Sequence, residues 1–295
     1  MYVLLDQFLD HLSAERGLSP HTRRAYGTDL RLFLDRLSRD GVVSVNDIRR
    51  KHIVDFLLDE RQGGKRPTTV GRRLAAIKTF LRYLRREGLL ASNPAEAMDS
   101  PRWGRRLPDA LTVREVERLL AQPDLRRRHG LRDRALLETM YAAGLRVSEA
   151  AGLTVDDVRL DDGWLRCMGK GRKERLVPLG ESARAYLRRY IEEQRPRQAA
   201  GGDTRALFLS DRRRALDRRS IWRLVRMYAR RAGIEKRVHP HTLRHTFATH
   251  LLANDAPLRV IQEMLGHADI GTTQLYTHVD ASRLRAVHQR YHPRA

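Results

Sequence analysis

Apolar residues in the first hundred positions recur every three or four places, the period of an α-helix with one buried face. Four such stretches begin near residues 3, 20, 50 and 68, and glycines at positions 17, 41, 63 and 64 separate them. Ser19-Pro20 suits the start of the second stretch, because serine caps helix N-termini and proline fits the first turn. Four amphipathic helices with short connections predict a small helical bundle.

The chain changes character between residues 93 and 108. Asn93-Pro94, Ser100-Pro101 and Pro108 disfavour both helix and central strand, because proline lacks an amide donor. We therefore expect a helical domain over residues 1–98, a linker over 99–110 and a second domain over 111–295.

Helical periodicity returns at the capping-box sequence Thr112-Val113-Arg114-Glu115 and continues to about residue 143. Near residue 158 the period changes, and we predict three short strands joined by tight turns, over residues 158–160, 164–168 and 175–179. Beyond residue 181 the pattern is helical to the end. The expected fold class is mainly α: a four-helix N-terminal domain, then a mostly helical domain with a small three-stranded antiparallel sheet.

The net charge narrows the range of functions. The 295 residues include 58 lysines and arginines against 36 aspartates and glutamates, a formal charge of +22. Both halves are basic, which favours a polyanionic partner, most simply nucleic acid. A GC-rich genome that encodes arginine at many surface positions is the alternative explanation, since 52 of the basic residues are arginine and only 6 are lysine.

The sequence also restricts the compartment. The single cysteine, Cys167, cannot form an internal disulfide, and no run of about 18 apolar residues is present to span a membrane. Asp6 and Asp10 within the first apolar stretch argue against a signal peptide. We expect a cytoplasmic protein with no membrane partner.

The fourth predicted helix carries a basic face that could follow a DNA groove. Its candidate DNA contacts are Arg72, Arg73, Lys78 and Arg82. A solvated face of the bundle explains the same residues at least as well.

Common catalytic signatures are missing from the sequence, and the acidic pairs at 156–157 and 161–162 suit turns better than a two-metal site. A different constellation follows Pro240, where His241, Arg244 and His245 share one face of a predicted helix. Two histidines at this spacing can bind zinc, but the arginine between them would repel the cation. Arginine with histidine suits an anion such as phosphate, and a surface cluster in an arginine-rich chain is the alternative.

Further segments complete a pattern over the second half. They are Gly144-Leu145-Arg146-Val147-Ser148-Glu149, Gly169-Lys170-Gly171-x-Lys173-x-Arg175, His241-x-x-Arg244, Leu265-Gly266-His267 and Tyr276. In order and spacing they resemble the tyrosine site-specific recombinases. The first hundred residues are similar to the SAM-like core-binding domain of that family, and the segment from Tyr276 to the end resembles its Xer branch.

The resemblance implies a transesterification in which Tyr276 attacks the scissile phosphate and leaves a 3′-phosphotyrosine and a free 5′-hydroxyl. His241 is the expected proton acceptor. Lys170, in the turn between the second and third strands, is the expected general acid for the departing 5′-oxygen, a role that arginine fills poorly because it does not readily release a proton.

The resemblance also assigns the electrostatic roles. Arg146, Arg244 and His267 would stabilise the charge that develops on the phosphate, so no cofactor and no metal ion is expected. Glu149 would orient Arg146, although an ordinary helix carboxylate explains it equally well. Arg172 and Lys173 join the candidate DNA contacts.

The Xer branch further implies four protomers on two duplex DNA sites, a Holliday junction, and the resolution of chromosome dimers at cell division. The implied partners are a second, XerC-like recombinase and an FtsK-like septal DNA translocase, and we expect residues 282–295 to dock on a neighbouring protomer. A mobile-element integrase is the first alternative, although the sequence begins with the core-binding helices and shows no preceding arm-binding domain. A catalytically inert, architectural DNA-binding protein is the second.

Overall fold

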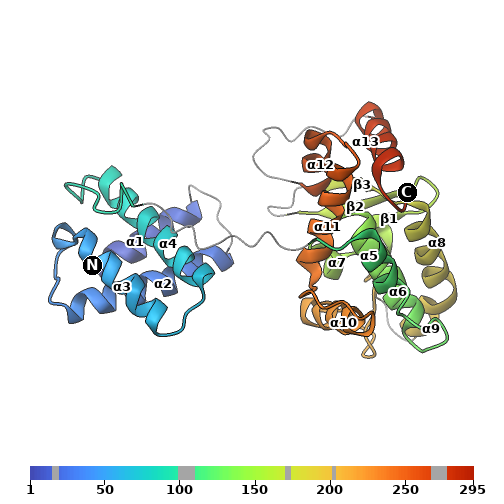
Figure 1. The fold of residues 1–295 in the computed structure, drawn as a ribbon, viewed down its shortest axis with the longest axis horizontal. Coiled ribbons are helices and arrows are strands. Elements are labelled where there is room, and N and C mark those ends of the chain that lie inside the picture. The colour runs from blue at the N-terminus through green and yellow to red at the C-terminus, as the bar shows by residue number, and fades with distance from the viewer. Residues whose placement is uncertain (15–19, 99–109, 170–173, 201–203, 267–277) are drawn as a thin grey trace. The chain divides into compact units, whose positions relative to one another are not determined.

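The computed structural model describes residues 1–14, 20–98, 110–169, 174–200, 204–266 and 278–295. The chain divides into two compact units, Met1–Arg105 and Arg106–Ala295. Most of the linker predicted over 99–110 lies outside the described residues. Figure 1 shows a first unit built from helices and a second in which helices surround a small sheet, which confirms the predicted fold class.

The first unit, which we call the N-terminal unit, is a bundle of four helices. They are α1 (Tyr2–Ala14), α2 (Pro20–Arg39), α3 (Arg50–Gln62) and α4 (Pro67–Arg86), with a single 3₁₀ turn, η1 (Val45–Asp47), before α3. Their apolar faces meet in one core, where the rings of Phe8 and Phe80 pack edge to face at 5.3 Å. The four helices and their shared core confirm the predicted helical bundle.

The second unit, which we call the catalytic unit, is centred on α6 (Gly130–Ala142). Almost every residue of α6 is buried, because helices on several sides pack against it. Before it comes α5 (Val113–Leu120), whose Thr112 and Glu115 form the predicted capping box. After it come α7 (Val147–Gly152) and the 3₁₀ turn η2 (Val155–Asp157).

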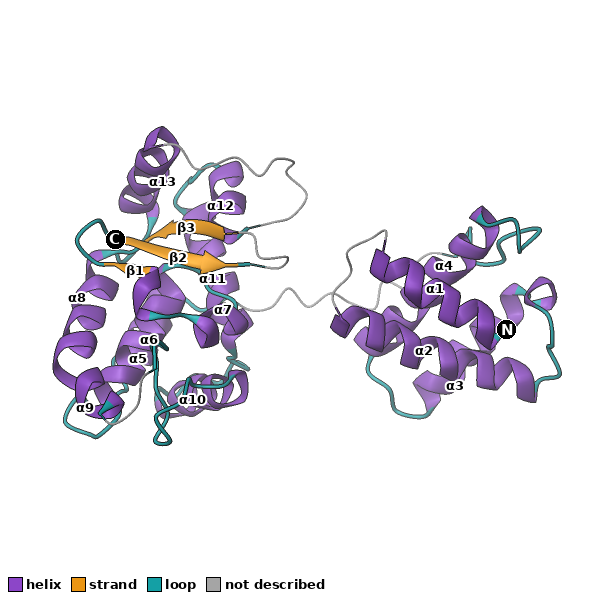
Figure 2. Ribbon diagram, turned by 180° about the vertical axis from the view of Figure 1, so that it is seen from behind, coloured by secondary structure: helices purple, strands orange, loops and turns teal. Residues whose placement is uncertain are grey.

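The sheet has the predicted three strands in the order β1-β2-β3, all antiparallel. They are β1 (Val158–Arg159), β2 (Trp164–Met168) and β3 (Glu174–Pro178). Figure 2 shows the three strands side by side within the helical shell. The register places Cys167 opposite Arg175, and both side chains are buried.

The remaining elements are mostly helical. They are α8 (Glu181–Arg189), the π-helical turn η4 (Tyr190–Gln194), α9 (Arg195–Ala199), α10 (Arg218–Arg231), α11 (Pro240–Ala253), α12 (Leu258–Leu265) and α13 (His278–Tyr291). The expectation of helix throughout is wrong between α9 and α10. There the amide of Leu207 donates to the carbonyl of Leu153, and Ala206 and Leu209 form antiparallel bridges with Thr154 and Ala215 instead of a helix.

The C-terminal segment packs on the catalytic unit of its own chain. Leu284 is fully buried, and His288 Nε2 donates to the carbonyl oxygen of Ala142 at 3.0 Å. Arg294 forms two hydrogen bonds with the carboxylate of Glu138 on α6. Within this single chain the segment that we expected to dock on a neighbour is part of its own core, so deleting it would destabilise the catalytic unit.

Candidate active site

The centre of the candidate site is the carboxylate of Glu149, in the first turn of α7. Its side chain is only 2% exposed. Oε1 accepts hydrogen bonds from Arg146 Nη1 at 2.8 Å and Arg175 Nη1 at 2.7 Å, and Oε2 accepts from Arg175 Nη2 and from the backbone amide of Arg146, both at 2.8 Å. One buried carboxylate therefore holds two arginines in fixed positions.

These contacts determine the protonation state of Glu149. Burial alone would raise the pKa of the carboxyl group, but the hydrogen bonds and positive charges of Arg175 and Arg146 outweigh it and hold the pKa below its usual range. Glu149 is thus ionised at neutral pH and accepts hydrogen bonds. Its position suits an orienting group better than a proton donor.

Three arginines also donate hydrogen bonds to backbone carbonyls at the end of α12. Arg175 Nε donates to the carbonyl of Met264 at 2.8 Å, Arg244 Nη2 to Leu265 at 2.5 Å, and Arg146 Nη2 to Gly266 at 3.1 Å. The last carbonyls of a helix have no partner within the helix and carry its partial negative charge, so guanidinium donors are favoured there. The residue after this helix end in the sequence is His267.

The cluster carries more positive than negative charge. Arg244 Nη1 lies 3.9 Å from Glu149 Oε2 and donates to the carbonyl of Gly144 at 2.7 Å. Burial, then repulsion from Arg146, lower the pKa of Arg244 to about 10, at which it stays charged at neutral pH. Three guanidiniums around one carboxylate leave two positive charges uncompensated among the described residues. Such a site attracts an oxyanion.

Two glycines allow the backbone conformations that place these side chains. Gly144 has φ +55°, and a Cβ there would lie 2.5 Å from the ring of Phe247 on α11, so the turn that precedes Arg146 requires glycine. Gly266 ends α12 in the left-handed conformation at φ +64°.

His241 and Arg244 lie on one face of α11, in its first two turns. Pro240 occupies the first turn, and His239 caps the helix by accepting a hydrogen bond from the amide of Thr242. His241 is exposed, and its ring centre lies 6.2 Å from that of His239. The helix thus presents an imidazole to solvent on the face that carries Arg244, a place from which it can reach a bound substrate.

The comparisons with known proteins agree with this geometry. The model of the phage integrase family matches residues 109–283, and that of its N-terminal SAM-like domain matches residues 5–88. Tyrosine recombinase XerD of Pseudomonas putida is 47% identical over 99% of this chain and 97% of that protein. Tyrosine recombinase XerD of Listeria monocytogenes is 42% identical over 99% of both chains. The chain belongs to the phage integrase family.

This confirms the predicted recognition, including the Xer branch, and the predicted enzyme class, a tyrosine-type site-specific DNA recombinase. The fold agrees as well. The crystal structure of XerH site-specific recombinase bound to palindromic difH substrate, a post-cleavage complex, superposes with a TM-score of 0.71 over 96% of this chain and 82% of that chain, at 24% identity.

Several site residues predicted for this phage integrase family member lie outside the described residues. They are Lys170, Arg172, Lys173, His267 and Tyr276. Of the predicted catalytic set, the structure describes Arg146, His241 and Arg244, together with the supporting Glu149. Arg175 lies within one of the quoted motifs, but no role was predicted for it. A charged residue at an inward-facing strand position was the signal that could have drawn attention to it.

The predicted DNA contacts on α4 differ in their surroundings. Arg82 is exposed, and Arg72 is 42% exposed while it pairs with Asp29. Lys78 Nζ donates to the carbonyl of Met98 at 2.6 Å. Arg73 is buried and forms ion pairs with Asp29 and Glu60, so it stabilises the bundle, and we leave it out of the proposed DNA contacts.

A further basic surface, which the sequence analysis missed, lies on α10. The helix contains no acidic residue, and the guanidinium of Arg226 lies 4.6 Å from the ring centre of the half-exposed Trp222. The exposed arginines are Arg218, Arg219, Arg223, Arg230 and Arg231. Their recurrence within a single amphipathic helix was visible in the sequence.

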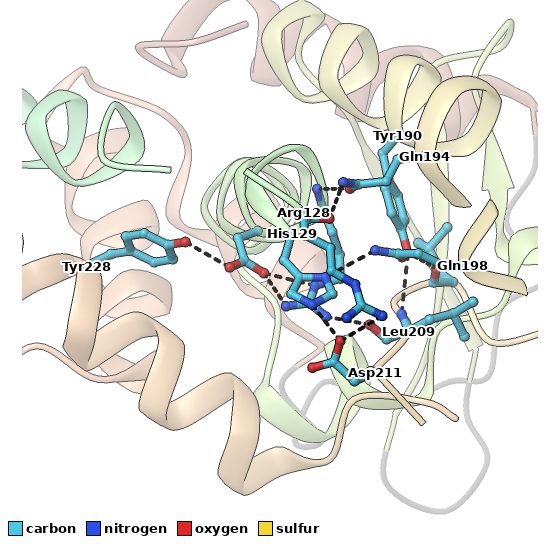
Figure 3. A network of polar contacts seen from close by, with 11 residues as sticks. Arg128, His129, Tyr190, Gln194, Gln198, Leu209, Asp211 and Tyr228 are labelled. Atoms are coloured by element: carbon cyan, nitrogen blue, oxygen red, sulfur yellow. Dashed lines mark hydrogen bonds and ion pairs between the residues drawn. The ribbon is translucent and has the colours of Figure 1, made fainter. Parts of the chain in front are cut away.

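A second buried arginine, Arg132, lies in a different network of the same unit. Figure 3 shows this region, with Tyr228 at one side and Leu209 at the other. Its Nε and Nη2 donate to Asp133 Oδ1, and its Nη1 donates to the carbonyl of Leu209 at 2.6 Å. Tyr228 completes the network, which we call the Asp133 network, by donating to Asp133 Oδ2 at 2.8 Å. One guanidinium faces one carboxylate, so this network is neutral.

Among the described residues, no set of three or more histidine, cysteine, aspartate or glutamate side chains is arranged to hold a metal ion. In the same ranges, every helix is too short or too polar to cross a membrane.

Proposed function

We propose that the protein cuts and rejoins DNA at specific sites through a 3′-phosphotyrosyl intermediate on Tyr276. The observation that supports this most strongly is the excess positive charge of Arg146, Arg175 and Arg244 around Glu149. A phosphodiester gains negative charge on its nonbridging oxygens as it reacts, and preorganised guanidiniums stabilise that charge. Arg146 and Arg244 are the two that would face the phosphate.

The proposed step forms one bond to phosphorus and breaks another. The Tyr276 phenol oxygen forms a bond to phosphorus, the bond from phosphorus to the 5′-oxygen breaks, His241 takes the phenol proton, and Lys170 gives a proton to the departing oxygen. His267 adds a donor to the phosphate. The phosphodiester energy is retained in the covalent intermediate, so the reverse reaction reseals the strand without ATP.

Duplex DNA is the proposed substrate, and several basic surfaces would grip its backbone. On the N-terminal unit these are Arg72, Lys78 and Arg82. On the catalytic unit they are Arg172, Lys173 and the exposed arginines of α10. Such contacts give affinity that falls steeply with salt and carry little sequence information.

At the level of the cell, we propose the role that the resemblance to the Xer branch implies, resolution of chromosome dimers at division. Four protomers would exchange two pairs of strands through a Holliday junction, with a XerC-like recombinase in the same tetramer and an FtsK-like septal translocase as activator. A mobile-element integrase is the alternative with the same chemistry. Recombination that requires the second Xer protein favours the first role, and efficient recombination by this protein alone favours the alternative.

The test of the chemistry uses a nicked duplex substrate that traps the covalent intermediate. The full-length protein, with the XerC-like partner added, should give a protein–DNA adduct that resists denaturation. Tyr276→Phe should give none while it still binds DNA. Binding without an adduct under all these conditions would contradict the proposal and favour an architectural protein.

A second arm of the same experiment tests the metal-free mechanism. Adduct formation should proceed at an unchanged rate in EDTA, because arginine and histidine supply the electrostatic stabilisation. A reaction that stops in EDTA and returns with magnesium would contradict this mechanism.

A further inference from the structure

We propose that Arg175 is a positioning residue for strand cleavage. It fixes the Glu149 carboxylate that orients Arg146, and it fixes the end of α12 from which the chain continues to His267. This inference deepens the proposed function and rests on it.

Arg175 is buried more deeply than the two arginines proposed to face the phosphate. Its side chain is 4% exposed, against 11% for Arg244 and 35% for Arg146. It therefore acts on the reacting phosphate only through its neighbours.

The guanidinium of Arg175 joins two elements that are distant in the sequence. Nη1 and Nη2 donate as a pair to the two carboxylate oxygens of Glu149, while Nε donates to the carbonyl of Met264. A bidentate pair fixes both the distance and the angle of its partner. The start of α7, the strand β3 and the end of α12 are thereby held to one another at a single point.

The position of Arg175 in the sheet is unusual for a purely structural residue. In β3 the side chains of Arg175 and Val177 point inward, and Leu165 and Cys167 of the adjacent strand are buried as well. An apolar residue at position 175 would complete this core without the cost of desolvating a charge. A role in orienting Glu149 explains why a buried arginine occupies this position.

Lysine cannot replace these contacts. Its single ammonium keeps the charge but lacks the planar fork that reaches both oxygens of Glu149 and the carbonyl of Met264 at once. With Arg175→Lys we expect Glu149 to hold Arg146 less rigidly, and the end of α12 to lose a donor. Misplacing catalytic groups by about 1 Å can slow a reaction about 100-fold while substrate binding is retained.

The test measures single-turnover adduct formation on the nicked substrate, with the full-length protein and its partner. Arg175→Lys should lower the rate constant by about 10- to 100-fold and leave the DNA dissociation constant within about twofold. The matched control is Arg132→Lys, the same change at an equally buried arginine that pairs with a carboxylate and a carbonyl. Below the melting temperature of both variants, the control should keep a rate within about threefold of wild type.

A double-mutant cycle shows whether Arg175 acts through Glu149. Glu149→Asp keeps the charge but shortens the side chain, so it cannot reach Arg146 and Arg175 together. Once Glu149→Asp is present, Arg175→Lys should slow the reaction by less than about threefold more, because both changes break the same connection. Additive losses would contradict the positioning role.

The outcomes separate this inference from the proposed function. If the wild type forms no Tyr276-dependent adduct, the proposed function fails and the positioning role fails with it. If the wild type reacts but Arg175→Lys matches Arg132→Lys, only the positioning role is wrong. Should Arg175→Lys fail to fold, Glu149→Asp alone makes the same test, and a wild-type rate for that variant would contradict the inference.

Discussion

The catalytic unit contains two buried arginine networks that differ in charge balance. In the Asp133 network, Arg132 faces one carboxylate and one carbonyl, and Tyr228 satisfies the remaining carboxylate oxygen. Around Glu149, three guanidiniums share a single carboxylate, and three successive carbonyls at the end of α12 accept further hydrogen bonds. Counted over the described residues, the first network is neutral and the second carries more positive than negative charge.

The difference separates a structural role from a functional one. A buried ion pair with all its groups hydrogen-bonded stabilises a position and has no use for a ligand. An excess of buried or half-buried positive charge raises the free energy of the unliganded protein: burial first, and then repulsion from Arg146, lower the pKa of Arg244. A phosphate that binds there relieves the repulsion. Charge balance, rather than burial, identifies the reactive arginines.

The largest predicted effect on stability comes from breaking the neutral network. Arg132→Met leaves Asp133 buried without its cation, which should cost about 3–5 kcal/mol of unfolding free energy. Arg146→Gln should cost about 1 kcal/mol or less, because Arg146 is partly exposed and its loss relieves repulsion. Denaturant unfolding followed by tryptophan fluorescence measures both, since Trp164 and Trp222 lie in the catalytic unit. Equal losses would contradict the distinction between the networks.

Acid should weaken the catalytic unit through His288, a buried histidine that has no carboxylate partner among the described residues. Burial lowers the pKa of His288 to about 4, and its neighbour His292 is buried beside it with its pKa well below the usual value. The unfolded chain therefore takes up protons first, and stability should fall as the pH decreases from about 6.5 to about 4.

The slope of that loss is about 1.4 kcal/mol per pH unit for each proton taken up on unfolding. His288→Gln should make the slope shallower. The ion pair of Arg294 with Glu138, beside the same histidines, is present in both the wild type and the variant. It therefore does not contribute to the difference between their slopes. A slope that His288→Gln leaves unchanged would show that other groups cause the acid sensitivity.

A tetrahedral oxyanion should bind the positively charged cluster and stabilise it. At a sulfate concentration well above its dissociation constant, we expect about 1–3 kcal/mol of added stability in the wild type, at constant ionic strength. Arg146→Gln should remove most of this gain. Arg223→Gln, which removes one exposed arginine from α10, should keep it, and an equal loss in both variants would indicate nonspecific binding.

The smallest predicted effect extends the comparison to the N-terminal unit, where α4 carries both kinds of arginine. Arg82→Gln should reduce the slope of log affinity for DNA against log salt by about one, the value for one phosphate contact. Arg73→Gln should leave that slope unchanged and lower the stability of the bundle, because Arg73 pairs with Asp29 and Glu60 inside it. If Arg73→Gln reduced the salt slope and Arg82→Gln did not, Arg73 would be the DNA contact and Arg82 would not.

The sequence was sufficient for the helices, the three strands and the members of the cluster that belong to spaced motifs. Arg146, Glu149 and Arg244 were identified in this way, and they meet in the structure although about a hundred residues separate Arg146 from Arg244. Arg175 was quoted but not assigned, because its contacts with Glu149 and with the carbonyl of Met264 appear only in the structure.

Two other differences have local physical causes. The basic face predicted for α4 included Arg73, because helical spacing cannot reveal that carboxylates from α2 and α3 approach it. The run Leu207-Phe208-Leu209 is too short to distinguish a helix from an extended segment, and the backbone partner of Leu207 is Leu153, more than 50 positions earlier.

The most direct test of the central claim, that charge imbalance marks the reactive arginines, is the single-turnover rate of adduct formation for Arg244→Gln beside Tyr228→Phe. Each variant removes a buried hydrogen-bonding group from one of the two networks, and both rates are normalised to folded protein. The account predicts a loss of about 10²–10³-fold for Arg244→Gln, the effect of removing one transition-state donor, and a change within about threefold for Tyr228→Phe. Similar rates for the two variants would contradict it.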